Sequence, residues 1–193
     1  MTTGSDRKLV EKYPELLANS AKPPTESLMC FGCECGDGWH KILDHLFGYF
    51  TSLMNRTLLV NYTKEYQDLH RGKKDYYQNY QSYRFSPPKI VLDQVKEKWG
   101  LIRIYHHTEF DGVPDDVWNV LNLEEFYKKM KEYEDILDWA IAFAEYQSSV
   151  TCEITGKDGK LYTHGWYRVL CDEEAVRLGY SPEQGGKLEI ENM

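Results

Sequence analysis

Residues 30–40 read CFGCECGDGWH, and this stretch separates an irregular amino-terminal region from the strongest helical pattern of the chain. Three of the five cysteines lie here, and a histidine follows closely. Cys30, Cys33, Cys35 and His40 could offer zinc three thiolates and an imidazole, which are ligands that suit this metal. Their irregular spacing argues against a metal knuckle.

Two other interpretations of the same stretch are a reactive thiol and a simple helix start. Cys35 precedes the start of the predicted helix, whose partial positive charge lowers a thiol pKa, and His40 could act as its base. In the structural interpretation, Gly36 turns the chain, Asp37 accepts hydrogen bonds from the first helical amides, and Trp39 begins the apolar stripe. Capping is far commoner than either chemistry, so we favour the structural interpretation.

Two helices have clear apolar stripes at intervals of three and four residues. The first stripe consists of Trp39, Ile42, Leu43, Leu46, Phe47, Phe50, Leu53 and Met54. The second helix is predicted to begin at Asn122, which forms a capping box with Glu125. Its stripe consists of Phe126, Met130, Tyr133, Leu137, Ile141 and Ala144.

Two shorter helices are also predicted. One covers residues 5–19, with Ser5 or Asp6 as its cap and a break or kink at Pro14. The other follows Pro114, a residue that is favoured at helix starts.

Strand patterns complete the predicted fold. Residues 89–99 alternate in part and residues 101–108 alternate well, with Gly100 between them, which predicts two antiparallel strands around a tight turn. A helix over residues 91–99 is the alternative. Residues 150–180 predict a turn, a strand pair and a short helix, and a flexible polar tail is expected over residues 181–193. Together these patterns predict an α+β fold, a single compact domain with helices packed on a small antiparallel sheet.

The composition restricts location and partners. A chain of 193 residues, 41% of them hydrophobic, can bury one substantial core. The sequence has no leader-like or membrane-spanning apolar run, so we expect a cytoplasmic protein without a membrane partner. The net charge of −8 disfavours duplex DNA. It suits a basic protein partner, although solubility is the commoner reason for an acidic surface. An odd number of cysteines predicts free thiols or metal ligands rather than disulfides.

Residues 62–88 are rich in tyrosine and in basic side chains without a clean period, and they predict a long excursion or insertion. Arg71, Tyr76, Tyr77 and Tyr80 are candidate binding residues here, because such side chains stack on bases, pair with phosphates and contact protein partners. A surface excursion whose tyrosines pack down onto the protein explains the composition equally well.

Basic residues on the predicted strand pair form another candidate site. Lys96 and Arg103, together with Lys98, could hold a small anionic ligand such as a nucleotide, with aromatic side chains stacking on it. The simpler interpretation is that these charges protect an exposed sheet edge.

Three segments, CFGCECGDGW, DQVKEKWGLIRIYHH and CEITGKDGKLYTHGWYRVLC, occur in this order. Together they resemble a family of uncharacterised phage and bacterial proteins with motifs such as ECGDGW, QVKEKFG-x-LRFYY and GW-x-x-LC. The resemblance covers residues 9–60 and 89–175 and implies a phage or prophage origin rather than an activity. In that family the carboxy-terminal segment resembles a zinc ribbon, with C-x2-C followed by C-x2-H.

This chain departs from the zinc-ribbon pattern at two of four ligand positions. Cys152 and Cys171 occupy the first and third positions, whereas Thr155 and Glu174 occupy the second and fourth. Structural zinc takes four ligands, so we expect a degenerate element without zinc or another cofactor. If a metal is bound, it needs a composite site. The candidate ligands of such a site are Cys30, Cys33, Cys152 and Cys171.

Packing must then replace the metal in this element. We expect Cys152 and Cys171 to be neighbours, because the segment between them can fold back as a hairpin. Trp166, Tyr167 and Leu170 are expected to fill the space near the missing ion.

No Walker loop, G-x-G-x-x-G, H-E-x-x-H or G-x-S-x-G motif is present, so the sequence does not indicate catalysis. Our hypothesis is a phage or prophage accessory protein that binds a host protein and counteracts a bacterial defence system. The alternative is a protein that binds or sequesters a small ligand such as a nucleotide.

Overall fold

The computed structural model describes residues 1–186, and these are grouped in two compact units. The first unit contains Met1–Thr51, Ile90–His107 and the described residues from Trp139 onward. The second unit contains Ser52–Lys89 and Thr108–Asp138. Of the predicted tail over residues 181–193, the part from residue 187 lies outside the described residues.

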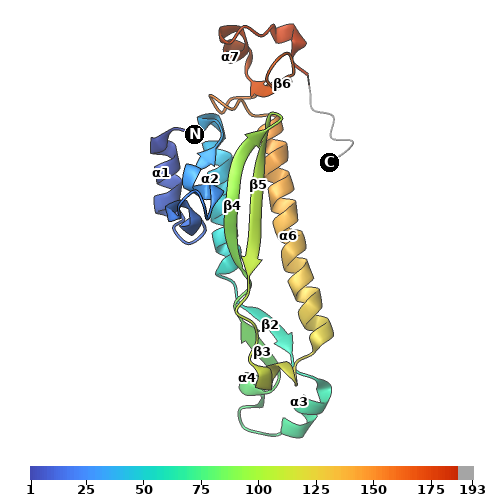
Figure 1. Ribbon diagram of the computed structural model, residues 1–193. Helices are drawn as coiled ribbons and strands as arrows, with labels where there is room; N and C mark the ends of the chain where they lie inside the picture. Colours follow the sequence, from blue (N-terminus) through green and yellow to red (C-terminus); the bar gives the residue numbers. More distant parts are fainter. Residues whose placement is uncertain (187–193) are drawn as a thin grey trace. The chain divides into compact units, whose positions relative to one another are not determined.

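Helices and strands are mixed along the chain, which confirms the predicted α+β class (Figure 1). The helices are α1 (Thr3–Lys12), α2 (His40–Met54), α3 (Lys64–His70), α4 (Tyr76–Asn79), α5 (Asp115–Trp118), α6 (Leu123–Ser149) and α7 (Asp172–Arg177). The strands are β1 (Cys33–Glu34), β2 (Leu58–Asn61), β3 (Ser82–Phe85), β4 (Lys89–Lys98), β5 (Leu101–Glu109), β6 (Lys160–Tyr162) and β7 (Arg168–Leu170). Within residues 1–186, 3-10 helices cover Ala18–Ala21, Leu28–Phe31, Asp37–Trp39 and Pro182–Gln184.

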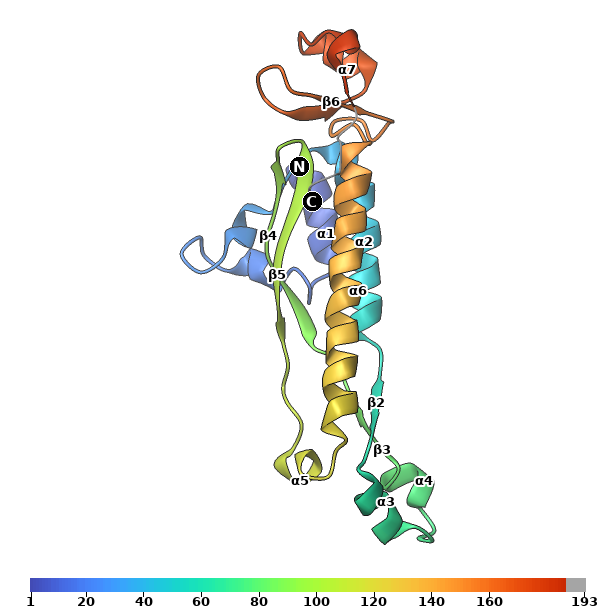
Figure 2. The same cartoon turned by 90° about the vertical axis from the view of Figure 1, so that its right-hand side faces the viewer.

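In the first unit, helices cover one face of the β4–β5 hairpin, as predicted. Figure 2 shows the parts of α2 and α6 that belong to this unit lying on the same side of the two strands. The predicted stripe is buried from Trp39 to Phe50, and Trp39, Phe47 and Phe50 are inaccessible to solvent, whereas Met54 at the end of the stripe is only partly buried. The sheet is mixed rather than purely antiparallel, because the short strand β1 joins β4 in parallel, with Cys33 opposite Val95.

The β4–β5 hairpin turns at Trp99 and Gly100, as the sequence predicts. Both residues have a positive φ, 60° and 76° respectively, which is the pattern of a two-residue type I′ turn. Gly100 suits this position because a Cβ there would also come within 2.7 Å of the Leu161 side chain. Trp99 is unusual, because non-glycine residues rarely adopt this conformation.

The amino-terminal helix differs from the prediction at its start. The Thr2 side chain caps α1 by accepting a hydrogen bond from the Ser5 amide at 3.4 Å, so neither Ser5 nor Asp6 is the cap. The helix ends before Pro14, as expected from the restriction that proline places on preceding residues.

The stretch around Gly36 begins α2 as predicted, but its polar contacts are different. Asp37 does not cap its own helix, because its carboxylate accepts the Thr2 amide at 2.7 Å. The two glycines allow this stretch to lie close to the backbone of residues 152–153. A Cβ on Gly36 would overlap the carbonyl oxygen of Glu153, and one on Gly38 would overlap that of Cys152.

Hydrogen bonds fix the same stretch to the carboxy-terminal region. The Gly38 amide donates to the Glu153 carbonyl at 2.9 Å, and the indole N–H of Trp39 donates to the Thr151 carbonyl at 2.7 Å. Residues 35–39, CGDGW, therefore lead into helix α2 and also pack tightly against residues 151–153. We call this tight contact the packing joint.

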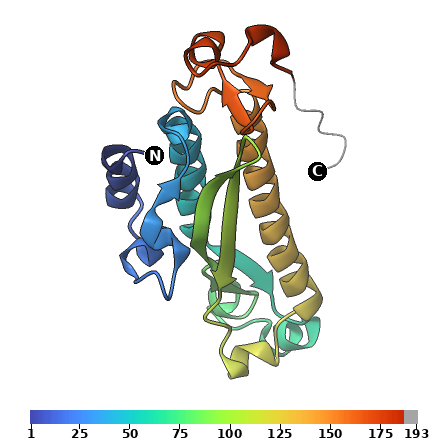
Figure 3. The same cartoon turned by 45° about the horizontal axis from the view of Figure 1, so that its top comes forward.

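The carboxy-terminal region has the predicted strand pair and short helix. Strands β6 and β7 are antiparallel, and α7 follows directly. Figure 3 shows this pair, in orange, beside the green β4–β5 turn. Residues 181–186 of the predicted tail include a 3-10 turn, and Gly186 exchanges two backbone hydrogen bonds of 2.9 Å with Leu161.

The second unit contains the predicted excursion, which is built on a strand pair that the sequence did not predict. Strands β2 and β3 are antiparallel, and the segment between them folds into α3 and α4. Its core consists of Val60, Tyr62, Phe85, Leu121 and Phe126.

Helix α6 begins with half of the predicted capping box. The Asn122 side chain accepts the Glu125 amide at 3.2 Å. The Glu125 carboxylate does not reach back to Asn122 and instead accepts the Asn61 amide at 3.1 Å, so it connects the helix to β2.

Candidate functional site

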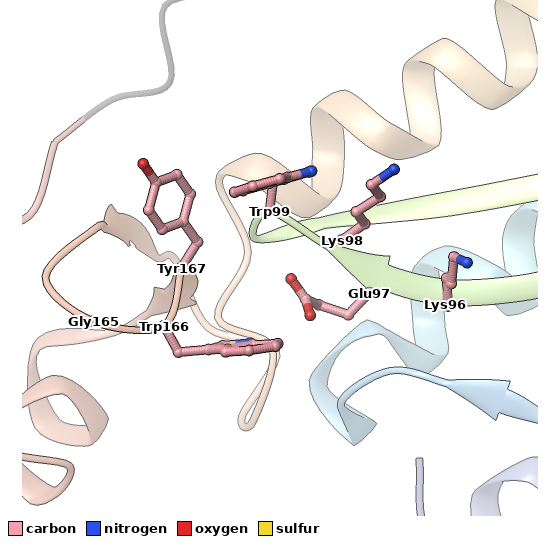
Figure 4. Close-up of a pocket in the computed structure, with 7 residues that line it drawn as sticks. All are labelled: Lys96, Glu97, Lys98, Trp99, Gly165, Trp166 and Tyr167. Carbon is pink, nitrogen blue, oxygen red and sulfur yellow. The ribbon is translucent and has the colours of Figure 1, made fainter.

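A cleft of about 560 Å³ lies at the β4–β5 turn in the first unit (Figure 4). One side comes from the end of β4 and its turn, and the other comes from the loop between β6 and β7. The lining residues are Lys96, Glu97, Lys98, Trp99, Gly165, Trp166 and Tyr167. We call this hollow the aromatic cleft.

Three aromatic rings in the cleft are accessible to solvent. Trp99 is 60% exposed, Trp166 is 72% exposed and Tyr167 is 37% exposed. Trp99 and Tyr167 meet edge to face, with centroids 5.4 Å apart. The hydroxyl of Tyr180 donates to the backbone carbonyl of Trp166 at 2.9 Å and fixes the loop that carries this tryptophan. The prediction that Trp166 and Tyr167 fill space near a missing metal is therefore wrong, because both rings face solvent.

Successive side chains along β4 point to opposite faces of the sheet, so Glu97 lies on a different face from Lys96 and Lys98. In Figure 4 the Glu97 carboxylate points between the two indoles, whereas the ammonium groups of Lys96 and Lys98 point away from them. Glu97 is held in place, since its Oε1 accepts the Gly100 amide at 2.7 Å. The interior of the cleft therefore presents aromatic faces and one carboxylate.

The two basic residues predicted to hold an anion both have partners in the first unit. The ammonium of Lys96 lies over the Tyr105 ring, 5.1 Å from its centroid. Arg103 forms a largely buried ion pair with Glu145. Burial raises the pKa of Glu145, and the nearby Arg103 guanidinium opposes that rise. Arg103 is thus a structural residue, whereas Lys96 borders the cleft, as Lys98 does.

The predicted binding residues of the excursion lie in the second unit. Arg71, Tyr76 and Tyr77 border a hollow of about 510 Å³ together with Gly72, Lys73 and Gln81. Tyr77 is 80% exposed, and Leu69 on the preceding helix is 78% exposed. We call the exposed side chains of residues 69–77 the excursion surface.

Other side chains of the excursion pack against one another. Tyr80 stacks on His70 with centroids 4.3 Å apart, and the Lys73 ammonium lies 4.7 Å from the Tyr80 centroid. The hydroxyl of Tyr76 donates to Gln67 at 3.2 Å. Arg71 pairs with Asp68 at 2.9 Å. The tyrosines are therefore divided between packing and exposure, and Tyr80 belongs to the packed group.

The cysteines near α2 are buried thiols. Burial raises the pKa of Cys35 to about 12, and it raises the pKa of Cys33 further. This shift is opposite in direction to the one that the reactive-thiol interpretation requires. The Nε2 atom of His40 is buried without a hydrogen-bond partner among the described residues. Cys30 is only partly buried.

Cys152 and Cys171 are free thiols that belong to one buried cluster with Tyr162, Leu170 and Ala175. Leu170 thus fills the space beside them, as predicted. Burial favours the neutral Cys152 thiol, but hydrogen bonds from the Thr155 hydroxyl and from the Cys171, Thr155 and Ile154 amides lower its pKa overall.

The other two zinc-ribbon positions have different partners. The hydroxyl of Thr155 lies 3.7 Å from the Cys171 sulfur, and Glu174 pairs with Arg177 at 2.6 Å. Among residues 1–186, no group of three or more histidine, cysteine, aspartate and glutamate side chains is arranged to hold a metal ion. The composite site with Cys30 and Cys33, which we named as the alternative if a metal is bound, is not assembled in that part of the chain.

A third hollow, of about 310 Å³, lies between α2 and α6 in the first unit and is lined by His45, Tyr49, Phe143 and neighbouring residues.

Trp139, which lies on α6, is 77% exposed and lies outside the aromatic cleft. It provides a matched reference for the cleft tryptophans.

Sequence reasoning missed four residues of the aromatic cleft: Glu97, Trp99, Trp166 and Tyr167. One local signal was present, because a tryptophan in a predicted tight turn cannot follow its strands into the core. For Trp166 and Tyr167 no such signal exists, since their exposure depends on the path of the loop between β6 and β7.

No protein-family model matches this chain, and neither the curated proteins nor the solved structures include a significant match. The resemblance to phage proteins therefore remains a prediction from three motifs. Within residues 1–186 no helix is long and apolar enough to span a bilayer.

Proposed function

We propose that this protein is a phage or prophage accessory protein that binds a host protein in the bacterial cytoplasm and counteracts a defence system. The observation that carries the binding role is the exposure of Leu69 and Tyr77 on the excursion surface. Tyrosine and arginine are enriched among the central residues of protein interfaces, and Leu69 adds exposed apolar area to the same surface. The phage origin rests on the motif resemblance.

The excursion is well suited to a contact role. It is held at its base by the β2–β3 pair, and its own packing contacts, such as Tyr80 with His70, support the helices. A supported surface loses little conformational entropy when it binds, so more of the contact energy is available for affinity. Tyr77 and Arg71 are residue types that often anchor such contacts.

Affinity capture from a bacterial lysate tests this proposal. The double variant Leu69→Ser/Tyr77→Ser removes the two exposed anchors, and Val176→Ser on α7 is the control, because Val176 is 61% exposed in the other unit. We expect the wild type and the control to retain the same host protein and the double variant to lose it. Identical sets of captured proteins for all three would overturn the role of the excursion surface.

The alternative, a nucleotide-binding protein, has weaker support. It needs cations that point into the aromatic cleft, but Lys98 points away from it and Lys96 contacts Tyr105. Arg103 pairs with Glu145, and the side chain that does point into the cleft is the Glu97 carboxylate. Thermal unfolding with added nucleotides checks this alternative. A ligand at one hundred times its Kd would add about 2.7 kcal/mol of stability, and we expect no such increase.

A further inference from the structure

We propose that the aromatic cleft binds the guanidinium group of an arginine side chain presented by the partner protein. The inference rests on the proposed function only in taking the partner to be a protein. It names the chemistry that this partner must present at a second surface, separate from the excursion surface.

The first argument is the aromatic lining. The faces of Trp99, Trp166 and Tyr167 carry a negative quadrupole that attracts cations, and tryptophan is the most favourable of the aromatic side chains. In most proteins such rings would be packed in the core, but here three of them line one hollow and remain accessible. The Trp99–Tyr167 contact fixes two of them in a mutual orientation, which reduces the cost of ordering them around a ligand.

The second argument is the charge inside the cleft. The Glu97 carboxylate points between the indoles and is positioned by the Gly100 amide, so it is ordered before a ligand arrives. Among residues 1–186 no cation forms an ion pair with Glu97. A ligand cation would provide the positive charge that this carboxylate does not face among the described residues, and it would also suit a chain with a net charge of −8.

The third argument selects arginine over other cations. A guanidinium is planar, stacks on aromatic faces and donates two parallel hydrogen bonds to a carboxylate. Lysine offers a compact, strongly hydrated charge that is harder to desolvate between indoles. A nucleotide could stack on the rings, but its phosphates would face the Glu97 carboxylate.

Binding of short peptides to the whole protein tests the inference directly. The probe is acetyl-Gly-Arg-Gly-amide, and its reference is the same peptide with citrulline, which keeps the shape of arginine and lacks the charge. Chemical shifts of the tryptophan indole N–H groups report both affinity and location. We expect the arginine peptide to bind at least about fivefold more tightly than the citrulline peptide and to move the Trp99 and Trp166 signals.

Three variants define the origin of this preference. Glu97→Gln retains an oxygen acceptor for the Gly100 amide and should reduce the difference between the two peptides, leaving the part that comes from the aromatic faces. Trp166→Ala should weaken the arginine peptide by at least about fivefold. Trp139→Ala removes an equally exposed tryptophan outside the cleft and should leave binding unchanged. Unfolding midpoints near the wild-type value show that each variant is folded.

The outcomes separate this inference from the proposed function. Equal binding of the arginine and citrulline peptides, an unaltered preference in Glu97→Gln, or tighter binding of adenosine monophosphate than of the arginine peptide would overturn the arginine site. Each of these results leaves lysate capture through the excursion surface untouched. Conversely, the peptide preference can hold in a protein whose capture does not depend on Leu69 and Tyr77.

Discussion

The indole of Trp99 meets the ring of Tyr167 edge to face, with the ring planes at 71°. This contact connects the β4–β5 turn to the β6–β7 loop, two segments that are far apart in the sequence. Such a pair contributes about 0.5–1.5 kcal/mol beyond its buried area. Because Trp99 is still largely exposed, the same ring can hold the two segments together and present a face to a ligand.

Replacement of Trp99 should weaken binding of the arginine peptide without a large change in the free energy of unfolding. Asparagine adopts a positive φ readily and is favoured before glycine in type I′ turns, so Trp99→Asn relieves backbone strain while it loses the contact with Tyr167. We expect the free energy of unfolding to stay within about 1 kcal/mol of wild type, whereas binding of the arginine peptide is lost. Urea unfolding and peptide titration measure the two effects. A loss of several kcal/mol would show that Trp99 is mainly a packing residue.

Gly38→Ala should destabilise the protein through a steric clash. A Cβ at this position overlaps the Cys152 carbonyl in a joint where the Gly38 amide also bonds to Glu153. Overpacking of this kind costs about 1–3 kcal/mol, which urea unfolding would detect. The control is Gly4→Ala, where a Cβ meets nothing within 4 Å and the residue lies in α1. A wild-type midpoint for Gly38→Ala would contradict the tight packing of this joint.

Cys35 should react slowly with iodoacetamide near neutral pH. Burial raises the pKa of its thiol to about 12, so the thiolate, which is the reactive form, is scarce at pH 7 and increases only as the pH approaches that value. Cys30 is more accessible and should be modified first. Peptide mapping by mass spectrometry after brief alkylation measures the order. Preferential modification of Cys35 at pH 7 would restore the reactive-thiol interpretation.

Protein purified without added zinc should contain no stoichiometric metal. The Cys152–Cys171 region is packed by Leu170 and Tyr162, and the residues at the other two ligand positions contact Cys171 and Arg177. Complete structural zinc sites contribute about 10–16 kcal/mol, so a chelator would unfold this region if it depended on zinc. We expect an unchanged unfolding midpoint with chelator. One tightly held equivalent of zinc that disappears in Cys152→Ser would prove the opposite.

Several elements were predictable because they depend on local sequence. The apolar stripe of α2, the glycine in the β4–β5 turn and the Asn122 cap of α6 each follow from the conformations and spacing that a short segment permits. The same is true of the strand pair and helix at the carboxy-terminal end, which are bounded by turn residues. These features need no knowledge of distant partners.

Contacts between distant segments could not be predicted in this way. Sequence patterns do not indicate that β1 pairs with β4, that Asp37 accepts the Thr2 amide, or that Gly36 faces the Glu153 carbonyl. The predicted capping box of Asn122 and Glu125 was half correct for the same reason. The Asn61 amide takes the Glu125 carboxylate as its acceptor, and this contact exists only because β2 lies beside the start of α6.

The sequence by itself therefore determined the α+β class, the main helices and the central hairpin, because periodicity and turn chemistry act over a few residues. Only the tertiary structure decided which aromatic side chains are buried and which are exposed. Trp39 is fully buried and Trp166 faces solvent, although each is a tryptophan that directly follows a glycine near a turn. The difference arises because burial depends on which surface the rest of the chain brings to each ring.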